Sequence, residues 1–369
     1  MKESGCGMEY TVSDKLWIEL SAVQGMTPRK FYKLLAQAED PQNLWEYPDE
    51  FTGIIDEKTY AAVRKLISEG DEHLFEVMDS CGITAVTRQD EAYPNALNDV
   101  SDAPPTLYIK GCLELTCDKP LGIVGTRRPS YDGRKAAGEF SKTLAQNGIT
   151  VVSGLARGID TCAHTGCLEA GGHTIAVLGN GLASVYPPEN EALAKRILDS
   201  GGSIVSELPP EDPPSRWTFP ARNRIIAALS HAALVVEGDI KSGAMITATC
   251  TLDLGREVFA IPGSIYNSVA SGTNRLIQSG ASPALDPFDI LEAMRWGGRP
   301  AERTLAKNKK PEMDENEAKI YDILKNECLS FEEIQNLSGF PVSELNSYLT
   351  MMLLRSIIIK LPGNLYRLA

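Results

Sequence analysis

The spacing of hydrophobic and polar positions changes along this chain and divides it into regions. Over residues 1–80, apolar side chains recur at the three- and four-residue intervals of short helices. Over residues 81–295, short apolar runs alternate with longer helical stretches, and after residue 312 the helical spacing returns. The pattern predicts a small helical domain over 1–80, an α/β domain over 81–295, a linker over 296–312 and a C-terminal domain over 313–369.

The apolar runs of the central region predict strands. They are nearly continuous in apolar residues, as strands covered on both faces are. Helical stretches separate most of them, which is typical of a doubly wound, mostly parallel sheet with helices on both faces. The predicted strands are Ile83–Val86, Thr106–Ile109, Leu121–Gly125, Thr150–Ser153, Thr174–Leu178, Ser203–Ser206, Ala233–Val236 and Glu257–Ile261.

The N-terminal helical pattern is similar to half of a helix-hairpin-helix or to a small SAM-like bundle. Its turn lies at Gly25, and Pro28 stands near the start of a helix. A hairpin that grips a DNA backbone usually has two glycines around a small apolar residue, whereas Met26 and Thr27 follow Gly25 here. A packing or protein-contact role is therefore favoured over DNA binding, which stays open.

The segment after residue 295 reads W-G-G-R-P-A-E-R-T-L-A-K-N-K-K-P and predicts a linker. Three helical patterns follow, at Glu315–Lys325, Ser330–Leu337 and Pro341–Leu354, and then two strand-like runs, I-I-I-K and L-Y-R-L. Three helices with a β-wing predict a winged helix. Its third helix has no Lys or Arg before Arg355, so it is poorly suited to bind the groove of duplex DNA. A role in packing or in contact with a partner protein is favoured instead.

Composition and charge narrow the classes of function. The chain is 43% hydrophobic and 23% charged, as ordinary soluble proteins are, and no apolar run could span a bilayer. Eight scattered cysteines without an apolar leader predict reduced thiols in a cytoplasmic protein. The net charge of −13 argues against nucleic acid, but residues 1–80 carry −8, residues 81–311 only −1 and residues 312–369 −4. A local basic groove with acidic flanks is therefore compatible with the sequence.

The turn after the predicted strand Leu121–Gly125 carries the most informative chemistry. It reads G-T-R-R-P-S and opens a helix. Such strand–helix turns of doubly wound sheets bind phosphate through backbone N–H groups. The glycines do not follow the G-x-G-x-x-G dinucleotide pattern, and the arginines favour a polyanion. The candidate phosphate-binding residues are Gly125, Thr126, Arg127 and Arg128; a tight turn with solvated arginines is the alternative.

A second glycine-bearing turn reads S-G-L-A-R-G-I-D-T-C-A-H. Asp160 is placed to cap the helix that follows. Cys162, His164 and Cys167 form C-x-H-x-x-C, which is not a common zinc arrangement, so neither a metal nor a catalytic Cys–His pair is expected. His164 is expected to be half-buried with its hydrogen bonds satisfied. The candidate binding residues of this turn are Ser153, Gly154 and Arg157.

The segment R-W-T-F-P-A-R-N-R places a cation and an aromatic residue three positions apart. Arg216 and Phe219 precede Pro220 and are expected in a loop, with a helix opening at Arg222. Such a pair can hold a phosphate and stack a base, respectively. The sequence is equally compatible with an alternative in which Trp217 and Phe219 lie in the core and the arginines form ion pairs. The candidates here are Arg216, Phe219, Arg222, Asn223 and Arg224.

A third turn, E-G-D-I-K-S-G-A-M-I-T-A, follows the strand Ala233–Val236 and opens a hydroxyl-rich helix with candidates Ser242, Gly243 and Thr247. The run from Gly263 to Arg275 adds further small polar residues. Because parallel strands end at one edge of a sheet, the turns predict a groove rather than a single pocket.

These motifs together resemble the DprA/Smf family, DNA-processing protein A of bacteria, from about residue 13 to the C-terminus. The resemblance rests on G-T-R-R-P-S, S-G-L-A-R-G-I-D-x-x-A-H, the run Phe219–Ser230, S-G-A-M-I-T-A and V-F-A-I-P-G. It implies an extended Rossmann domain that binds single-stranded DNA, a homodimer, and delivery of the strand to RecA during uptake of transforming DNA. By motif position, Arg127 is similar to the family's turn arginine, and Arg216 and Phe219 to its cation–aromatic pair. Thr126 stands where many relatives have serine, and Arg216 where some have lysine; both keep the chemistry.

The sequence therefore predicts a non-enzymatic, cofactor-free binder of single-stranded DNA that loads RecA. The alternative is a Rossmann-like enzyme of the phosphoribohydrolase type, acting on nucleoside monophosphates. Such enzymes carry P-G-G-x-G-T-x-x-E after a late strand, whereas this chain has Glu237-Gly238-Asp239 without the following glutamate. A winged-helix regulator is a third possibility, weakened by the acidic C-terminal domain.

Overall fold

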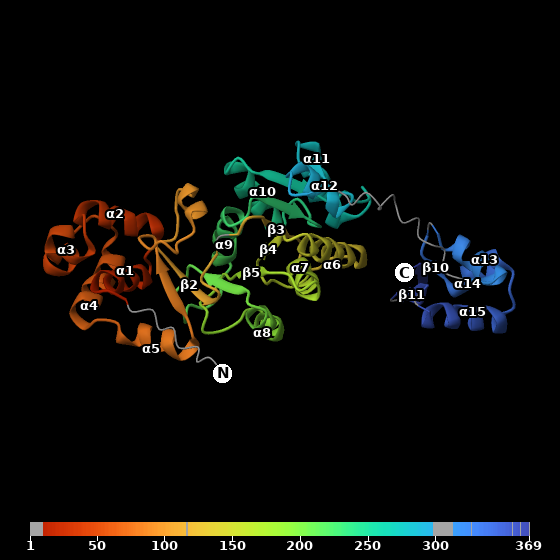
Figure 1. Cartoon of the computed structure of the whole chain (residues 1–369), viewed down its shortest axis with the longest axis horizontal. Coiled ribbons are helices and arrows are strands. Elements are labelled where there is room, and N and C mark those ends of the chain that lie inside the picture. Colours follow the sequence, from red (N-terminus) through yellow and green to blue (C-terminus); the bar gives the residue numbers. More distant parts are fainter. Residues whose placement is uncertain are drawn as a thin grey trace. The chain divides into compact units, whose positions relative to one another are not determined.

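The computed structural model describes residues 10–115, 117–297, 313–325, 327–355, 357–361 and 363–368. The chain divides into two compact units, Met1–Gly298 and Arg299–Ala369 (Figure 1). Most of the predicted linker, residues 298–312, lies outside the described residues. Within the described residues, no helix is both long and apolar enough to cross a membrane.

A nine-stranded sheet forms the centre of the first unit, in the order β1-β2-β6-β5-β4-β3-β7-β8-β9. The strands from β6 to β9 are parallel, and β1 and β2 join antiparallel at one edge. The mostly parallel α/β prediction is therefore confirmed, while the antiparallel edge and the short strand β9 were not predicted. The strands are β1 Thr84–Thr87, β2 Thr106–Gly111, β3 Pro120–Val124, β4 Thr150–Ser153, β5 Thr174–Val177, β6 Ser203–Ser206, β7 Ala232–Val235, β8 Glu257–Ala260 and β9 Ser282–Pro283.

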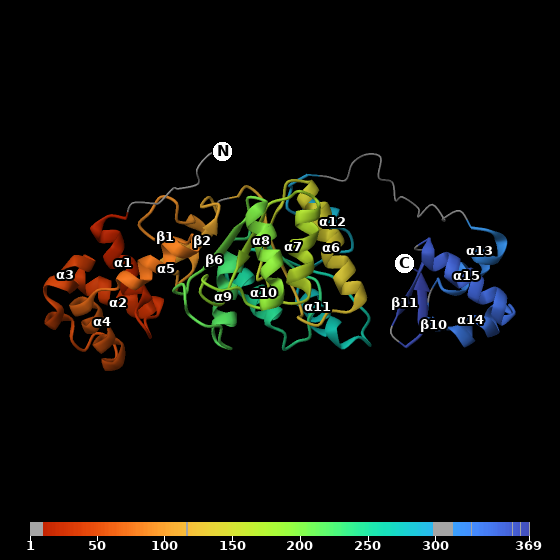
Figure 2. The same cartoon turned by 90° about the horizontal axis from the view of Figure 1, so that it is seen from below.

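Helices cover both faces of this sheet because alternate strand residues point to opposite sides. On β3, Leu121 and Ile123 pack with α6 (Tyr131–Gln146), α7 (Ile159–Glu169) and α12 (Pro287–Ala293). Val124 packs on the opposite face with α9 (Thr218–Ala228) and α10 (Gly243–Asp253). Figure 2 shows α6 and α7 side by side at the sheet. The remaining helices of this region are α8 (Glu191–Asp199) and α11 (Ser271–Gln278).

Five helices precede the sheet: α1 Val12–Ala22, α2 Pro28–Ala38, α3 Pro41–Glu46, α4 Glu57–Glu69 and α5 Glu72–Cys81. They have a core of their own, which includes Phe31 and Leu34. They also contact the sheet region, since Trp17 donates its indole N–H to the carbonyl of Pro105 at 2.8 Å and Ile18 packs in a cluster with Tyr108. The helices belong to the same compact unit as the sheet; a separate N-terminal domain stays a prediction.

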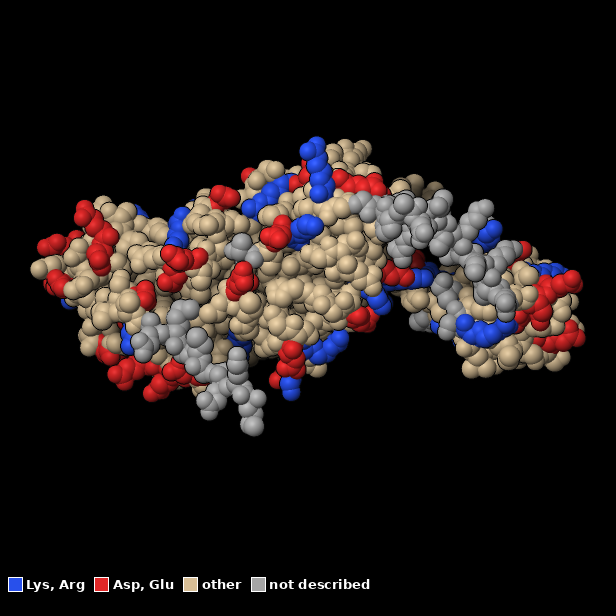
Figure 3. Space-filling view, viewed as in Figure 1, with Lys and Arg blue, Asp and Glu red and all other residues tan. Residues whose placement is uncertain are grey.

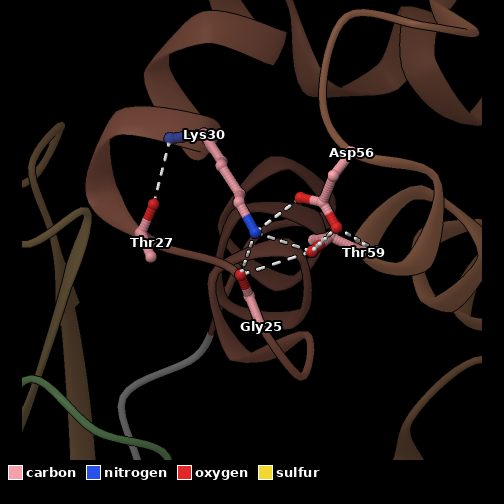
Figure 4. Close-up of polar contacts among 5 residues, drawn as sticks. All are labelled: Gly25, Thr27, Lys30, Asp56 and Thr59. Carbon is pink, nitrogen blue, oxygen red and sulfur yellow. Dashed lines mark hydrogen bonds and ion pairs between the residues drawn. The ribbon is translucent and has the colours of Figure 1, made fainter.

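The turn between α1 and α2, the possible DNA-gripping hairpin, is closed by its own residues (Figure 4). The Lys30 ammonium donates to the Gly25 carbonyl at 2.9 Å and to the Thr59 hydroxyl at 2.8 Å, and it pairs with Asp56 at 2.6 Å. Lys30, one of the two bases in the first turn of α2, is therefore neutralised within the protein. Acidic side chains also gather over these helices in Figure 3, which supports the packing interpretation of the hairpin.

The second unit contains α13 (Glu315–Ile323), α14 (Phe331–Ser338) and α15 (Val342–Leu354), with a small antiparallel sheet. Its strands are β10 (Leu329–Ser330), β11 (Ile358–Leu361) and β12 (Leu365–Leu368), in the order β10-β12-β11. The helices and the last two strands match the expected ones closely, and β10 was missed because it is only two residues long. Identification of this unit as a winged helix stays a prediction.

Candidate nucleic-acid interface

A groove of about 940 Å³ runs across the carboxyl ends of the central parallel strands. Its walls come from the turns after β3 and β4, the start of α9 and the start of α10. The predicted site residues that line it are Gly125, Thr126, Arg127, Arg128, Arg216, Phe219, Arg222, Asn223, Ser242, Gly243 and Thr247. The three turns predicted from the sequence thus meet in one groove.

The turn after β3 is fixed by backbone contacts. The amide of Thr126 donates to the carbonyl of Glu237 at 2.7 Å, and its carbonyl accepts from the amide of Ile159 at 3.2 Å. A Cβ atom at Gly125 would lie 2.5 Å from the Ile159 side chain, so this glycine is required by packing. The Thr126 amide is therefore already used within the protein, and phosphate binding at this turn stays a prediction. The exposed side chains of Arg127 and Arg128 remain as cations of this turn.

The N-terminus of α6, where a doubly wound sheet usually holds a phosphate, contains a carboxylate of the protein itself. Glu237, only 8% exposed, accepts from the Ser130 amide at 2.8 Å and from the Ser130 hydroxyl at 2.6 Å. A side chain at Gly133 would collide with the same carboxylate, at 2.2 Å from its nearest oxygen. The position at which a bound mononucleotide would place its phosphate is therefore filled.

Arg127 and Phe219 form the centre of the groove wall. The Arg127 guanidinium carbon lies 4.9 Å from the centre of the Phe219 ring, and Tyr186 contacts that ring at a centroid distance of 5.6 Å. A cation over an aromatic face at this distance is attracted by the ring quadrupole. The Phe219 side chain is half-buried, which is intermediate between the exposed ring of a groove contact and the fully buried ring of the core alternative. Sequence reasoning missed Tyr186, which lies in a loop far from the glycine-rich turns.

The start of α9 differs from the expectation. The helix begins at Thr218, so Phe219 lies in its first turn rather than in a loop. Pro220 is tolerated there because first-turn amides have no intrahelical acceptor. The Arg216 guanidinium lies 4.7 Å from the centre of the Trp217 ring, and Trp217 is 72% exposed. The alternative that placed Trp217 in the core is therefore wrong.

Arg222 lies at the floor of the groove and does not reach out as a phosphate contact. It is 4% exposed and donates to the carbonyl of Gly154 at 2.7 Å and to that of Val177. The carboxylate of Asp160 lies nearby and accepts from the Gly154 and Ala156 amides, instead of capping α7, whose N-cap is Gly158. Burial raises the pKa of Asp160 to about 6 and lowers that of Arg222 to about 10. This buried pair fixes the loop after β4.

The other predicted site residues of the β4 turn and of α9 either stabilise the fold or lie beside the groove. Arg224 pairs with Glu207 at 2.5 Å and with Asp102 at 3.2 Å, outside the groove. The hydroxyl of buried Ser153 donates to the Ile123 carbonyl at 2.6 Å. A side chain at Gly154 would strike Arg222, and Arg157 pairs with Glu189 at 2.6 Å beside the groove. The prediction that Arg224 and Ser153 are direct binding contacts is therefore wrong, because both side chains already have partners within the protein.

The start of α10 supplies the opposite wall. The Ser242 hydroxyl caps this helix by accepting from the Ala244 amide, and Asn223 donates to the Gly243 carbonyl at 3.1 Å. Space next to Gly243 is open, with no atom within 4 Å of an added Cβ. Thr247 lines the floor with 1% of its surface exposed. This wall is small and polar, so a chain of nucleotides can approach the backbone closely.

The segment Cys162–Cys167 shows no sign of a metal centre. Cys167 is buried and its thiol donates to the carbonyl of His173 at 3.2 Å. Over the described part of the chain, no group of three or more His, Cys, Asp or Glu side chains is arranged to hold a metal ion. His164 is fully buried rather than half-buried: Nδ1 contacts the Thr174 hydroxyl at 2.7 Å, and Nε2 has no partner among the described residues.

We expect His164 to make the protein acid-sensitive. Burial, with the charge of Arg222, lowers its pKa to about 3 in the folded state, whereas an unfolded histidine has a pKa of about 6.5. Between these values only the unfolded chain takes up the proton, so stability falls as the pH drops below about 6.5. At pH 5 this amounts to about 2 kcal/mol. Urea unfolding at pH 7.5 and pH 5 should show a smaller acid loss in His164→Asn than in the wild type; equal losses would contradict this origin.

Comparisons with known proteins identify the relatives of this chain. The sequence profile of the DNA recombination-mediator protein A family matches residues 84–295. Protein Smf of Synechocystis is 37% identical over 286 residues, 75% of this chain and 72% of that protein. Protein Smf of Escherichia coli is 44% identical over 207 residues, 56% of this chain and 55% of that protein.

Solved structures show the same likeness. The crystal structure of DNA processing protein A from Streptococcus pneumoniae matches with a TM-score of 0.68 at 34% identity, over 77% of this chain and 98% of that one. The structure of DNA processing protein A from Helicobacter pylori, described for its single-stranded DNA binding mode, matches with a TM-score of 0.53 at 28% identity, over 58% and 95%. Since the family profile spans more than half of the sequence, the chain belongs to the DNA recombination-mediator protein A family.

Proposed function

We propose that this protein binds single-stranded DNA in the groove and delivers the strand to RecA during natural transformation, without catalysing a reaction. The observation that carries the proposal is the Arg127–Phe219 pair, a cation and an aromatic ring 4.9 Å apart in the wall of an open groove. Arginine binds phosphate, and an aromatic ring stacks on an unpaired base. Bases in a duplex are already stacked and paired, so this pair suits a single strand.

Different residues of the groove provide the contacts to phosphates and the contacts to bases. Arg127, Arg128 and Arg216 are exposed and provide positive charge along it. Phe219 and Tyr186 provide aromatic surface. Stacking tolerates every base, so we expect weak sequence preference.

The geometry disfavours the enzymatic alternative, a phosphoribohydrolase. Two carboxylates lie at the position of the phosphoribohydrolase motif. Asp239 accepts from the Lys241 amide at 2.7 Å, and Glu237 is buried and held by Ser130 at the N-terminus of α6. In this arrangement it occupies the phosphate position instead of facing a substrate. We therefore propose that the protein turns over neither nucleoside monophosphates nor ATP.

Homodimer formation and contact with RecA are part of the proposal and follow from membership of the family. We also propose a SAM-like character for the N-terminal helices and a winged-helix character for the C-terminal unit, both based on their patterns of helices and strands. Sedimentation of the full chain, alone and with purified RecA, tests the two assemblies. A strict monomer at micromolar concentration counts against the dimer.

We expect the protein to bind oligonucleotides with a preference for single strands. Fluorescence anisotropy with labelled single- and double-stranded oligonucleotides over a range of salt concentrations measures this. The logarithm of the affinity for single strands should fall with the logarithm of salt, with a slope of about −0.7 for each phosphate contacted. Equal affinity for the duplex at moderate salt, or steady release of base or phosphate by the purified protein, would contradict the proposed function.

A further inference from the structure

Two strongly exposed aromatic side chains flank the groove and have no role in the mechanism described above. Trp217 is 72% exposed and Tyr266 is 93% exposed. Both stand next to groove residues in sequence: Ser215 and Arg216 line the groove beside Trp217, and Val269 lines it three residues after Tyr266. An exposed aromatic ring beside a nucleic-acid groove can stack on an unpaired base.

Each aromatic side chain is carried by backbone that the protein holds in place. At the start of α9, the Thr218 hydroxyl donates to the carbonyl of Gly179, the second residue after β5. In the loop after β8, the carbonyl of Val269 accepts from the amide of Gly238 at 2.7 Å, and the Gly238 carbonyl accepts from Gly272 at 2.9 Å. These bonds fix the loops, while the rings of Trp217 and Tyr266 stay largely exposed to solvent.

The two aromatic side chains belong to different ends of the groove. Trp217 is anchored near the end of β5 and Tyr266 follows β8, and the sheet order between these strands is β5-β4-β3-β7-β8. Four steps between neighbouring strands, at about 4.8 Å each, separate the ends of β5 and β8 by about 19 Å. That span is longer than one nucleotide. Phe219 packs against Gly179 and so lies at the β5 end with Trp217, whereas Arg127 follows β3, between the two ends.

We propose that Trp217 and Tyr266 are terminal base-stacking positions, so that a single strand crosses the whole sheet edge from β5 to β8. This inference rests on the proposed function and extends it by giving the path of the strand. Arg216, whose guanidinium lies 4.7 Å from the Trp217 ring, holds a phosphate at that end. The Arg127–Phe219 pair binds the strand beside that end. Affinity then depends on length: an oligonucleotide too short to reach Tyr266 gains nothing from that ring.

The test is a length series of oligothymidylates, of 3 to 15 nucleotides, measured by anisotropy on the full chain and on Trp217→Ala and Tyr266→Ala. For the longest oligonucleotides, each substitution should weaken binding by roughly 5- to 150-fold, the equivalent of about 1–3 kcal/mol for one stacked base. For the shortest, which bind at the Arg127–Phe219 pair, Tyr266→Ala should equal the wild type. Tyr47→Ala, which removes another exposed tyrosine (55%) that follows α3, is the matched control and should bind as the wild type at every length.

A second readout uses the natural fluorescence of Trp217, since stacking on a base quenches an indole. Trp217→Phe keeps an aromatic ring and should retain affinity while losing most of the quenching that long oligonucleotides cause. If Trp217→Ala and Tyr266→Ala, with wild-type melting temperatures, bind long oligonucleotides as the wild type does, the path is wrong although the proposed function stands. If the unaltered protein binds no single strand at all, the proposed function fails, and the path fails with it.

Discussion

Replacing Arg222 with methionine is expected to lower the free energy of unfolding by about 3–5 kcal/mol, because a buried carboxylate then loses its nearby countercharge and two buried carbonyls lose their donor. Arg222 lies at the floor of the groove with 4% of its surface exposed, close to Asp160. Without the guanidinium, the Gly154 and Val177 carbonyls lose a donor and the buried carboxylate loses its countercharge. Chemical denaturation at pH 7.5 measures the loss.

Two further variants separate this scaffold role from DNA binding. Arg216→Met removes an exposed arginine of the same segment, so it should leave the stability unchanged and weaken binding to single strands. Asp160→Asn combined with Arg222→Met removes both charges and should recover part of the stability lost in the single variant. If Arg222→Met instead unfolds like the wild type but fails to bind DNA, Arg222 is a direct contact and our assignment is wrong.

The sequence predicted the framework of the sheet well because the parallel strands are short, buried and apolar. Thr150–Ser153 and Ser203–Ser206 are strands with the predicted boundaries. The carboxyl ends of such strands meet at one edge, and this rule alone was enough to bring the three glycine-bearing turns into one groove. The two-residue strands β9 and β10 were missed because two residues show no periodicity.

The roles of the individual arginines could not be predicted from the sequence, because exposure and partners depend on tertiary contacts. Arg222 and Arg224 lie two positions apart in α9, yet one is buried beside Asp160 and the other pairs with Glu207. The anion at the N-terminus of α6 was also missed, since Glu237 lies in the loop after β7 and is 107 residues from Ser130 in sequence. A long-range contact of this kind leaves no local pattern.

The largest effects on DNA affinity are expected at Arg127 and Phe219, and the two substitutions should differ in kind. Arg127→Ala removes a phosphate contact, so it should weaken binding and make the salt slope shallower by about 0.7. Phe219→Ala removes a stacking surface, which costs about 1–3 kcal/mol of binding with little change in slope. Anisotropy titrations at several salt concentrations measure both quantities.

The combined variant should lose less affinity than the sum of the two single losses. The Arg127 guanidinium lies 4.9 Å from the Phe219 ring centre, so each single substitution also disturbs its neighbour, and residues in contact are not additive. Thermal melts on the same samples show whether Phe219 is a residue of the groove or of the core. Because Phe219 is half-buried, Phe219→Ala should reduce stability by less than the about 3–5 kcal/mol of a core phenylalanine. A collapsed melting temperature with normal residual affinity would place Phe219 in the core and remove it from the binding surface.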